Sequence, residues 1–505
     1  MSWNQGHFRF MSFKEWVADK YRLWFYVLFF LCFQFSNGMY FSAMTQMQGT
    51  NSISLNDVKM ISHAVLCGLT LFFPLAFRLK FFLPNKTCLI VATTMLALCN
   101  LIVPFVESPI VLIIVGFIAG FFRLFGTFEC FSSLLPKITP THNYAVFLSF
   151  VFFIVLGVIH LFDAISIQII YFYSWKHLHF LAIGLMLIVI LLAIVFMKNF
   201  RAMPKMPLYG IDWLGMVLWA IFILSFIFIF QYGNQLEWFK SDYIRIAVAS
   251  TFISLGFNIA RMNYIRHSFL EIEAFKVHNL IYLLLSFLFL GILLASKNTL
   301  QNIFTANVLH IDYLNSSKLK VAEFIGAALG SLFSFFALTK LKLSHKLIAF
   351  IGFAMISIYI FLMYFIISTQ TNIEQLYLPL ICCNFGHLSI FISLTVYIQA
   401  TAPFKNYFQV LCILGFIRTG IASPIGDAIY QHGLTKITNQ HLEQINNFVP
   451  TEAFVTAIQQ LYGWSFIFCV LILILLAATR FKKDVKKPII TIKSIYKMTK
   501  NKIQI

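Results

Sequence analysis

Long runs of apolar residues, separated by short polar segments, dominate the sequence from end to end. A helix that crosses a bilayer needs about 20 mostly apolar residues, and fourteen such stretches recur along the chain. They are predicted at residues 23–43, 58–78, 87–106, 110–131, 143–169, 178–197, 211–231, 243–262, 278–300, 316–339, 346–368, 376–399, 408–431 and 461–480. An outer-membrane barrel would instead show alternating segments of about ten residues. The pattern predicts an all-helical, multi-pass membrane protein.

The composition excludes other classes of protein. Of the 505 residues, 60% are hydrophobic and only 11% are charged, whereas soluble domains average roughly a quarter charged residues. An ordinary soluble enzyme is therefore excluded, and so is a disordered chain, which would be poor in apolar residues. A formal charge of +19 would suggest nucleic acid in a soluble protein. In a membrane protein it marks the cytoplasmic side, so no nucleic-acid partner is expected.

The basic residues also predict the orientation of the chain. If the N-terminus is inside and the loops alternate, most of the 37 Lys and Arg fall on the inner side. An excess of Lys and Arg marks cytoplasmic loops, so both termini are expected in the cytoplasm. Lys297 and Lys320 are counted here with the external loops. Only Arg123 and Arg418 are left inside predicted helices.

The loops divide the chain into five parts. These are a cytoplasmic amphipathic lead-in at 1–22, a six-helix bundle at 23–200, a linker with two inserted helices at 201–276, a second six-helix bundle at 277–480 with a long external loop at 432–460, and a basic cytoplasmic tail at 481–505. Similar basic turns at 76–86 and 337–346 lie eight helices apart. Such an offset fits two related halves around an insert, and secondary transporters are built from repeats of this kind.

The sharpest local motif lies in residues 207–242. A proline-led linker meets Asp-Trp-x-Gly at the start of a helix, and the helix ends in Gly-Asn before a Trp. The motif residues are Asp212, Trp213, Gly215, Gly233, Asn234 and Trp238. This segment resembles the inserted helix pair of the fourteen-helix drug:proton antiporters of the major facilitator superfamily, the EmrB/QacA-like family. Residues 416–430 are similar to a glycine-rich stretch of that family through Arg418, Gly420 and Gly426.

The resemblance covers nearly the whole chain in layout and about fifty residues in motif detail. It implies the major facilitator fold with 14 transmembrane helices in a 6+2+6 order and cytoplasmic termini, in an inner membrane. The family's Asp in the first helix is missing from residues 33–41, and its Gly-Pro pair is missing from residues 151–165. These departures, with a composition rich in Phe, Ile and Lys, are typical of a divergent, Bacteroidota-type member.

The implied function is secondary active transport by alternating access. The expected protein is a proton-coupled exporter of lipophilic or amphipathic small molecules, similar to a multidrug exporter. The expected partners are the substrate, protons and the lipid bilayer. In bacteria with two membranes, relatives also dock a periplasmic adaptor protein and an outer-membrane channel.

Ionisable side chains inside predicted helices are the candidate functional residues, because charge at bilayer depth is costly unless it is paired or hydrated. Arg123 and Glu129 lie on one helix, and His160 and Asp163 share a face of the next helix because they are three residues apart. We predict that Arg123, Glu129 and Asp163 form a cluster whose carboxylate exchanges a proton during transport. A structural ion pair between the two helices is the alternative.

The second half of the chain offers Arg418, Glu323 and His387 as candidates for the substrate cavity. Arg418 lies in the middle of its helix and is predicted to be a counter-ion for an anionic substrate or a packing residue. Glu323 lies early in its helix and is expected near the outer surface. Asp212 starts an inserted helix, where a carboxylate favourably meets the helix N-terminus, so we predict a cap and not a transport residue.

Two other functions stay open from the sequence. A lipid or glycan-lipid flippase would have a similar number of helices. Several cations in the cavity would favour a flippase, and the sequence offers only two, Arg123 and Arg418. A membrane-embedded acyltransferase is a remote alternative that depends on His387 alone. The sequence contains no P-loop GxxxxGK[ST], no zinc-ligand spacing and no G-x-S-x-G, so no ATP-driven export, cofactor or metal site is expected.

Overall fold

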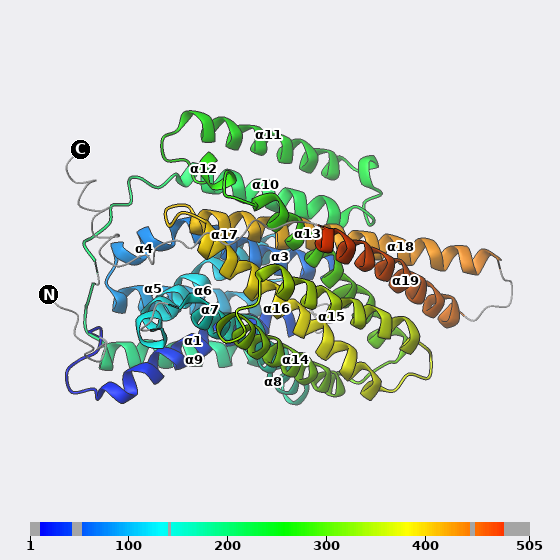
Figure 1. Cartoon of the computed structure of the whole chain (residues 1–505), viewed down its shortest axis with the longest axis horizontal. Coiled ribbons are helices and arrows are strands. Elements are labelled where there is room, and N and C mark those ends of the chain that lie inside the picture. Colours follow the sequence, from blue (N-terminus) through cyan, green and yellow to red (C-terminus); the bar gives the residue numbers. More distant parts are fainter. Residues whose placement is uncertain (1–10, 43–52, 140–142, 202, 445–449, 479–505) are drawn as a thin grey trace.

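The protein is a bundle of long helices that run along a common direction (Figure 1). The computed structural model describes residues 11–42, 53–139, 143–201, 203–444 and 450–478. In these ranges, thirteen helices are long and apolar enough to cross a membrane. A further helix of 24 residues, α1 (Asp19–Ser42), occupies the first predicted stretch. The prediction of an all-helical, multi-pass membrane protein is confirmed.

The six spans that precede the insert use continuous or interrupted helices, whose short 3₁₀ or π-helical segments carry the label η. In chain order they are α1; α3 (Leu55–Phe72), η1 (Phe73–Leu75) and α4 (Ala76–Phe82); α5 (Asn85–Ile102) and η2 (Val103–Phe105); α6 (Pro109–Ile138); α7 (Tyr144–Phe152), η3 (Phe153–Gly157) and α8 (Val158–Phe172); and α9 (Trp175–Phe196). The insert consists of α10 (Trp213–Tyr232), η4 (Trp238–Lys240) and α11 (Asp242–Tyr264).

A short helix, α12 (Ile272–Phe275), leads from the insert into the last six spans. In chain order these are α13 (Leu280–Ser296), η5 (Lys297–Gln301) and η6 (Phe304–Val308); α14 (Tyr313–Thr339); α15 (His345–Ile366); η7 (Ile373–Leu376) and α16 (Tyr377–Thr401); α17 (Tyr407–Gly415), η8 (Phe416–Ala422) and α18 (Ser423–Gln444); and α19 (Pro450–Ala478). Below, the N-terminal half means α1 to α9 and the C-terminal half means α13 to α19.

The two halves meet along two seams. At one seam, α7, η3 and α8 pack directly against α14. At the other seam, α3 and η1 pack against α17 and η8. The inserted helix α10 packs on α3 and also on η8 and α18, so it covers the second seam from outside, while α11 lies beyond α10 at the edge of the molecule (Figure 1).

Aromatic rings close one end of the second seam. Phe77 of the N-terminal half packs against Phe404 and Phe408 of the C-terminal half, with ring centroids 5.1 and 4.7 Å apart. Phe128 on α6 adds a contact to Phe408 at 5.5 Å. Aromatic pairs of this kind contribute about 0.5–1.5 kcal/mol beyond the area they bury. This end of the bundle is the end that the basic residues predict to be cytoplasmic.

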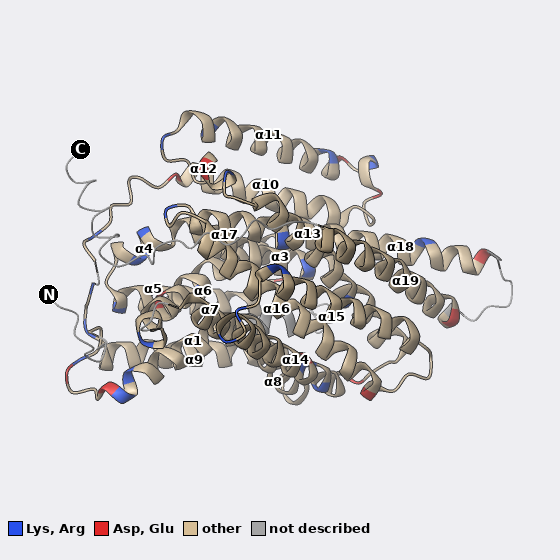
Figure 2. Ribbon diagram, in the orientation of Figure 1, with Lys and Arg blue, Asp and Glu red and all other residues tan. Residues whose placement is uncertain are grey.

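Charged residues are distributed unevenly over the bundle. Figure 2 shows many Lys and Arg at the end where α4 and the link from α9 to α10 lie, as the predicted orientation requires. Other basic residues lie in the middle of the helices, near α3, α13 and α16. A charge at that depth needs a partner, so these residues direct attention to the seams.

One expected segment differs from the prediction, and another lies outside the described residues. The external segment 432–460 was expected to be a loop, but α18 continues to Gln444 and α19 starts at Pro450, because the two helix ends pack on each other. In the lead-in, residues 11–18 pack on α1 and α9: Lys14 N donates to Phe196 O at 2.9 Å and the Phe13 side chain is buried. The tail at 481–505 lies outside the described residues.

Candidate functional site

Glu323 on α14 is a buried carboxylate with three basic neighbours. Its carboxylate lies 3.0 Å from Lys297 Nζ on η5 and 3.2 Å from Lys320 Nζ one turn earlier on α14. His160 Nδ1 on α8 lies 2.9 Å from the same carboxylate. Glu323 is only 2% exposed. Glu323 is thus enclosed within the bundle, where Lys297 and Lys320 oppose its charge and His160 contacts it; its place near the outer surface of the membrane stays a prediction.

The Glu323 cluster, defined as Glu323, Lys297, Lys320 and His160, joins the two halves. His160 belongs to the N-terminal half, and the other three residues belong to the C-terminal half. Lys297 Nζ also donates to Asn384 Oδ1 on α16 at 3.4 Å. Lys320 and Glu323 share α14, while η5 supplies Lys297 and α8 supplies His160, so the contact with His160 forms only when the halves are packed together.

Asp163 and Arg123 lie beside this cluster in the N-terminal half. Asp163 Oδ2 is 3.9 Å from His160 Nδ1, as expected for residues three apart on one helical face. Arg123 interacts electrostatically with Asp163, and its Nη2 donates to Gln34 Oε1 on α1 at 2.9 Å. Gln34 in turn donates to Thr127 Oγ1 at 3.1 Å. The structure thus brings Arg123, His160 and Asp163 into one neighbourhood.

Glu129 has a different partner from the one predicted. Lys80 Nζ, on α4, lies 3.4 Å from Glu129 Oε2, and Ser133 Oγ donates to Glu129 Oε1 at 3.2 Å. Both Glu129 and Lys80 are buried, and both belong to the N-terminal half. The predicted cluster of Arg123, Glu129 and Asp163 is therefore split. Glu129 sits one and a half turns beyond Arg123 on α6, where α4 supplies a lysine that the sequence had assigned to a loop.

Arg418 and His387 lie near the Glu323 cluster from the C-terminal side. Arg418 is on η8, and its guanidinium stands 4.7 Å from the centroid of the Phe391 ring. His387, one turn before Phe391 on α16, interacts electrostatically with Arg418, Lys297 and Glu323. Arg418 Nη1 and His387 Nε2 are buried without a hydrogen-bond partner among the described residues. The structure thus gathers the three cavity candidates of this half at one place.

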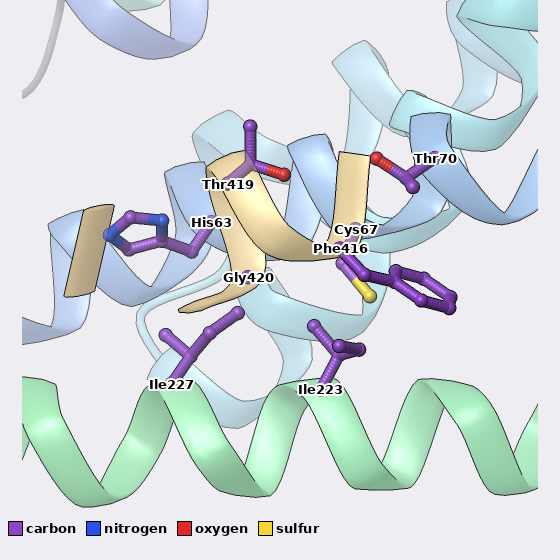
Figure 3. A pocket seen from close by; sticks show the side chains of 8 residues that line it. All are labelled: His63, Cys67, Thr70, Ile223, Ile227, Phe416, Thr419 and Gly420. Atoms are coloured by element: carbon purple, nitrogen blue, oxygen red, sulfur yellow. The ribbon is translucent and has the colours of Figure 1, made fainter. Parts of the chain in front are cut away.

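A second contact joins the halves beside α10. His63 Nε2 on α3 lies 3.8 Å from Asp427 Oδ2 on α18, and Thr299 Oγ1 donates to Asp427 Oδ1 at 2.6 Å. Next to it, α3, α10 and η8 border a gap that is too narrow to hold a water molecule. Figure 3 shows Ile223 and Ile227 of α10 pointing into this space toward α3 and η8. The inserted helix therefore forms one wall of the seam.

The inserted-helix motif has structural roles that its residues explain. Asp212 is the N-cap of α10: its Oδ1 accepts from Gly215 N at 2.8 Å and its Oδ2 from Phe269 N at 3.1 Å, while Arg261 donates to the same carboxylate. Burial disfavours the Asp212 carboxylate, but these donors outweigh it and lower its pKa. A Cβ on Gly215 would lie 2.2 Å from this carboxylate. Asp212 is a cap, as predicted.

The other end of α10 is built by the Gly-Asn-Trp part of the motif. Trp238 packs on Gly233, where a Cβ would lie 2.8 Å from the indole ring, and Trp238 Nε1 donates to Asn234 Oδ1 at 3.2 Å. Trp213 is 43% exposed on the outer side of α10. These motif residues shape the insert and its turn, and their described contacts lie away from the Glu323 cluster.

Sequence reasoning missed Lys297, Lys320, Asn384 and Lys80. Lys297 and Lys320 fall inside the predicted spans 278–300 and 316–339, yet they were counted with the external loops. Their position within apolar stretches was the available signal, since a charge there is a functional candidate by default. Asn384 and Lys80 gave no such signal, because their partners come from distant helices.

Comparison with known proteins identifies the fold. No protein-family model and no curated protein matches the chain. Among solved structures, an auto-inhibited peptide transporter of the POT family superposes with a TM-score of 0.58 at 15% identity, over 92% of this chain and 98% of that chain. Proton-dependent oligopeptide transporters give 0.61 at 12% over 91% and 98%, and the nucleoside transporter NupG gives 0.55 at 12% over 90% and 99%.

The chain has the major facilitator fold, as predicted, and it is a multi-pass membrane protein. At these identities the likeness shows the fold alone. Membership of the EmrB/QacA-like drug:proton antiporters stays a prediction of the inserted-helix motif.

Proposed function

We propose that the protein is a secondary active transporter that works by alternating access between its two halves. The observation that carries this proposal is the buried Glu323 cluster, in which His160 of one half meets Glu323 of the other at 2.9 Å. Secondary transporters place substrate and coupling-ion sites between their repeats near the middle of the membrane. The solved neighbours, peptide and nucleoside transporters, support the same class.

Proton coupling follows from the chemistry of this contact. Glu323 as a carboxylate attracts His160 and so favours the packed arrangement of the halves. A proton on Glu323 removes this attraction, and separation of the halves then exposes the carboxyl group to water. Protonation and conformation are thereby linked, because a ligand shifts an equilibrium toward the state that binds it better.

The helix geometry beside the cluster suits such a change. The spans that supply His160, Lys297 and Arg418 all contain π-helical turns at or just before these residues: η3, η5 and η8. Short π-helical segments inside α-helices are frequent at functional sites. We propose that these turns absorb the local rearrangement when the halves separate.

The direction and substrate class of the leading proposal come from the resemblance to drug exporters. We propose export of lipophilic or amphipathic small molecules across an inner membrane. A periplasmic adaptor and an outer-membrane channel are proposed partners on the resemblance alone. Glu129 is retained as a second proton-carrying candidate, although its partner Lys80 lies in the same half.

A specific observation favours the second candidate, a lipid or glycan-lipid flippase. The sequence offered only Arg123 and Arg418 as buried cations near the cavity. The structure adds Lys297, which is buried, and Lys320, whose side chain is 30% exposed; both pair with Glu323. Several cations are what an anionic headgroup would require, so the argument against a flippase no longer applies. The acyltransferase alternative depends on His387, and its test is loss of all function in His387→Ala while Glu323→Gln and Glu129→Gln remain active.

The test of the transporter proposal is a proton-flux assay in proteoliposomes that contain the pH-sensitive dye pyranine. Ethidium, carboxyfluorescein and a fluorescent phospholipid are offered in turn under an imposed pH gradient. We expect protein-dependent movement of at least one probe, coupled to proton flux in the wild type and uncoupled in Glu323→Gln. Glu237→Gln is the matched control, since Glu237 lies on the surface and pairs only with Lys240 among the described residues.

Comparison of Glu129→Gln with Glu323→Gln in the same assay distinguishes the two proton-carrying candidates. Flux that ignores both the pH gradient and Glu323→Gln contradicts coupling at Glu323. Absence of protein-dependent movement of every probe class contradicts the transporter proposal itself.

A further inference from the structure

We propose that the substrate carries an anionic group, a carboxylate or a phosphate, and that Arg418 and His387 bind it at the seam. This inference rests on the proposed transport function and names the chemistry of its substrate. The binding site is the region bounded by Arg418, His387 and the Glu323 cluster, where the two halves meet.

Two hydrogen-bond donors at this place are unused. Arg418 Nη1 and His387 Nε2 are buried without a partner in the described part of the chain. Most buried polar groups in proteins are hydrogen-bonded, and those that are not need an explanation. A carboxylate or a phosphate supplies acceptors for both, because the guanidinium donates and the imidazole donates from Nε2 in the tautomer that carries its proton there. Charge-assisted hydrogen bonds of this kind are among the strongest in proteins.

Aromatic packing holds these donors at the seam. The Arg418 guanidinium lies over the Phe391 ring, and His387 meets the same ring edge-on with centroids 6.3 Å apart. Phe391 also packs against Phe152 of the N-terminal half at 4.7 Å. The ring contact holds the guanidinium at the seam, and a guanidinium can bind a carboxylate or phosphate with two parallel hydrogen bonds. A site built this way changes when the two halves move.

The charge balance favours the same sign of ligand. Four cations, Arg123, Lys297, Arg418 and the 30% exposed Lys320, stand against two carboxylates, Asp163 and Glu323, in this neighbourhood. Inside a membrane protein such an excess is unfavourable unless it is neutralised. A cationic substrate would add to the excess. An anion compensates it.

The surroundings also indicate the body of the ligand. Phe391 contacts Phe152 and Phe287, so an apolar wall flanks the unpaired donors. An anionic head with an apolar body fits this combination. Such a molecule can be a water-soluble organic acid or an anionic lipid, and the shared chemistry is the acidic oxygen group.

The test is a binding measurement on the purified full-length protein in an uncharged detergent. Its thermal unfolding midpoint is measured against increasing benzoate or phenyl phosphate as soluble probes, and phosphatidic acid in mixed micelles as the lipid probe. Benzylammonium and phosphatidylcholine are the charge controls. We expect anionic probes alone to raise the midpoint. The arm with the larger rise, soluble or lipid, identifies the source of the anion.

The variant that carries the test is Arg418→Gln. Loss of a hydrogen bond to a charged group should weaken the apparent affinity for the anionic probe by roughly tenfold to hundredfold. Arg418→Lys should retain part of it. The matched control is Arg245→Gln at an exposed site paired with Asp242, which should bind like the wild type. If Arg418→Gln does not fold, His387→Phe provides a second comparison, because it removes the Nε2 donor and keeps an aromatic ring beside Phe391.

Two outcomes overturn the inference: benzylammonium stabilises as well as benzoate, or the anionic shift survives unchanged in Arg418→Gln and His387→Phe. Its failure is distinct from failure of the transport proposal. Flux of cationic dyes that ignores Arg418→Gln refutes the anionic site and leaves transport standing. Anion binding that depends on Arg418, without flux of any probe, refutes transport and leaves the site standing.

Discussion

The substitution Glu323→Gln tests whether the buried ion pairs of the Glu323 cluster hold the structure together. Glutamine keeps the shape of the side chain and removes its charge. Lys297 then loses its carboxylate at 3.0 Å and keeps only the neutral Asn384 oxygen at 3.4 Å among its described contacts. The Lys297 residue is 9% exposed, so water does not replace the lost partner.

The size of the effect follows from this burial. Removing one partner of a buried ion pair costs about 3–5 kcal/mol, because the other charge is left uncompensated. Lys320 adds little, since 30% of its side chain is exposed and surface pairs contribute about 0–1 kcal/mol. We expect the free energy of unfolding to fall by about 3–5 kcal/mol. This is a large part of the roughly 5–15 kcal/mol that stabilises a typical protein.

A second substitution separates this cause from a general packing defect. In the double variant Glu323→Gln with Lys297→Met, the stranded ammonium group is removed. Replacing a buried ion pair by neutral groups of similar volume is often neutral for stability, so the double variant should recover most of the loss. The control Glu237→Gln, at a side chain that is 68% exposed, should stay within about 0.5 kcal/mol of the wild type.

The assay is reversible unfolding in mixed micelles with increasing dodecyl sulfate, followed by circular dichroism. The expected order of stability is wild type first, then the double variant, then Glu323→Gln. A Glu323→Gln protein within 0.5 kcal/mol of the wild type would refute the reasoning. So would a double variant that is less stable than the single one.

Three further predictions concern the insert. Arg261 and two backbone donors lower the pKa of Asp212 in spite of burial. The ionised carboxylate therefore stabilises the folded protein above the unfolded pKa, and this stabilisation is lost as pH falls through the folded pKa. The difference in unfolding midpoint between the wild type and Asp212→Asn should shrink on acidification below about 4. A Cβ on Gly233 would lie 2.8 Å from Trp238, whereas a Cβ on Gly256 would meet nothing within 4 Å. In the same unfolding assay, Gly233→Ala should lower the free energy of unfolding by about 1–3 kcal/mol, and the control Gly256→Ala should not lower it. Hydrogen bonding ties the turn after α10 to α3 (Asn56 Nδ2 to Gln235 Oε1, 2.8 Å), while the contact of α10 with η8 is apolar (Trp219 on Phe416). In a cysteine-free background, a cleavable bifunctional thiol cross-link between cysteines at 56 and 235 should therefore preserve probe flux, and one between cysteines at 219 and 416 should block it until cleaved.

The fold was predictable because it depends on local composition. A stretch of about 20 apolar residues specifies a membrane helix wherever it occurs, since every backbone polar group must be satisfied inside the bilayer. The spans at α3, α6 and α14 lie where the apolar stretches predict them. The loop at 432–460 was misjudged because polar residues can continue a helix outside the membrane when a neighbouring helix packs on them.

The site was only partly predictable, because its contacts join residues that are distant in the chain. The sequence identified four of the candidate residues, because an ionisable side chain within an apolar stretch can be recognised from its immediate neighbours in the chain. These are Arg123, His160, Asp163 and Arg418. The Glu323 contacts with Lys297 and His160 span 26 and 163 residues, and no local pattern reports them. For the same reason Glu129 was joined to Arg123 on its own helix, while its partner Lys80 comes from α4.

The sequence by itself determined that this is a membrane protein with two groups of six helices and an inserted pair, and that Asp212 caps an inserted helix. Hydropathy and capping act over one helix, so the order of residues is enough to decide them. Only the tertiary structure decided which charges meet. Pairing a buried charge depends on which helices pack together at the seam, and that packing brings Glu323 to the lysines and His160, and Arg418 to His387.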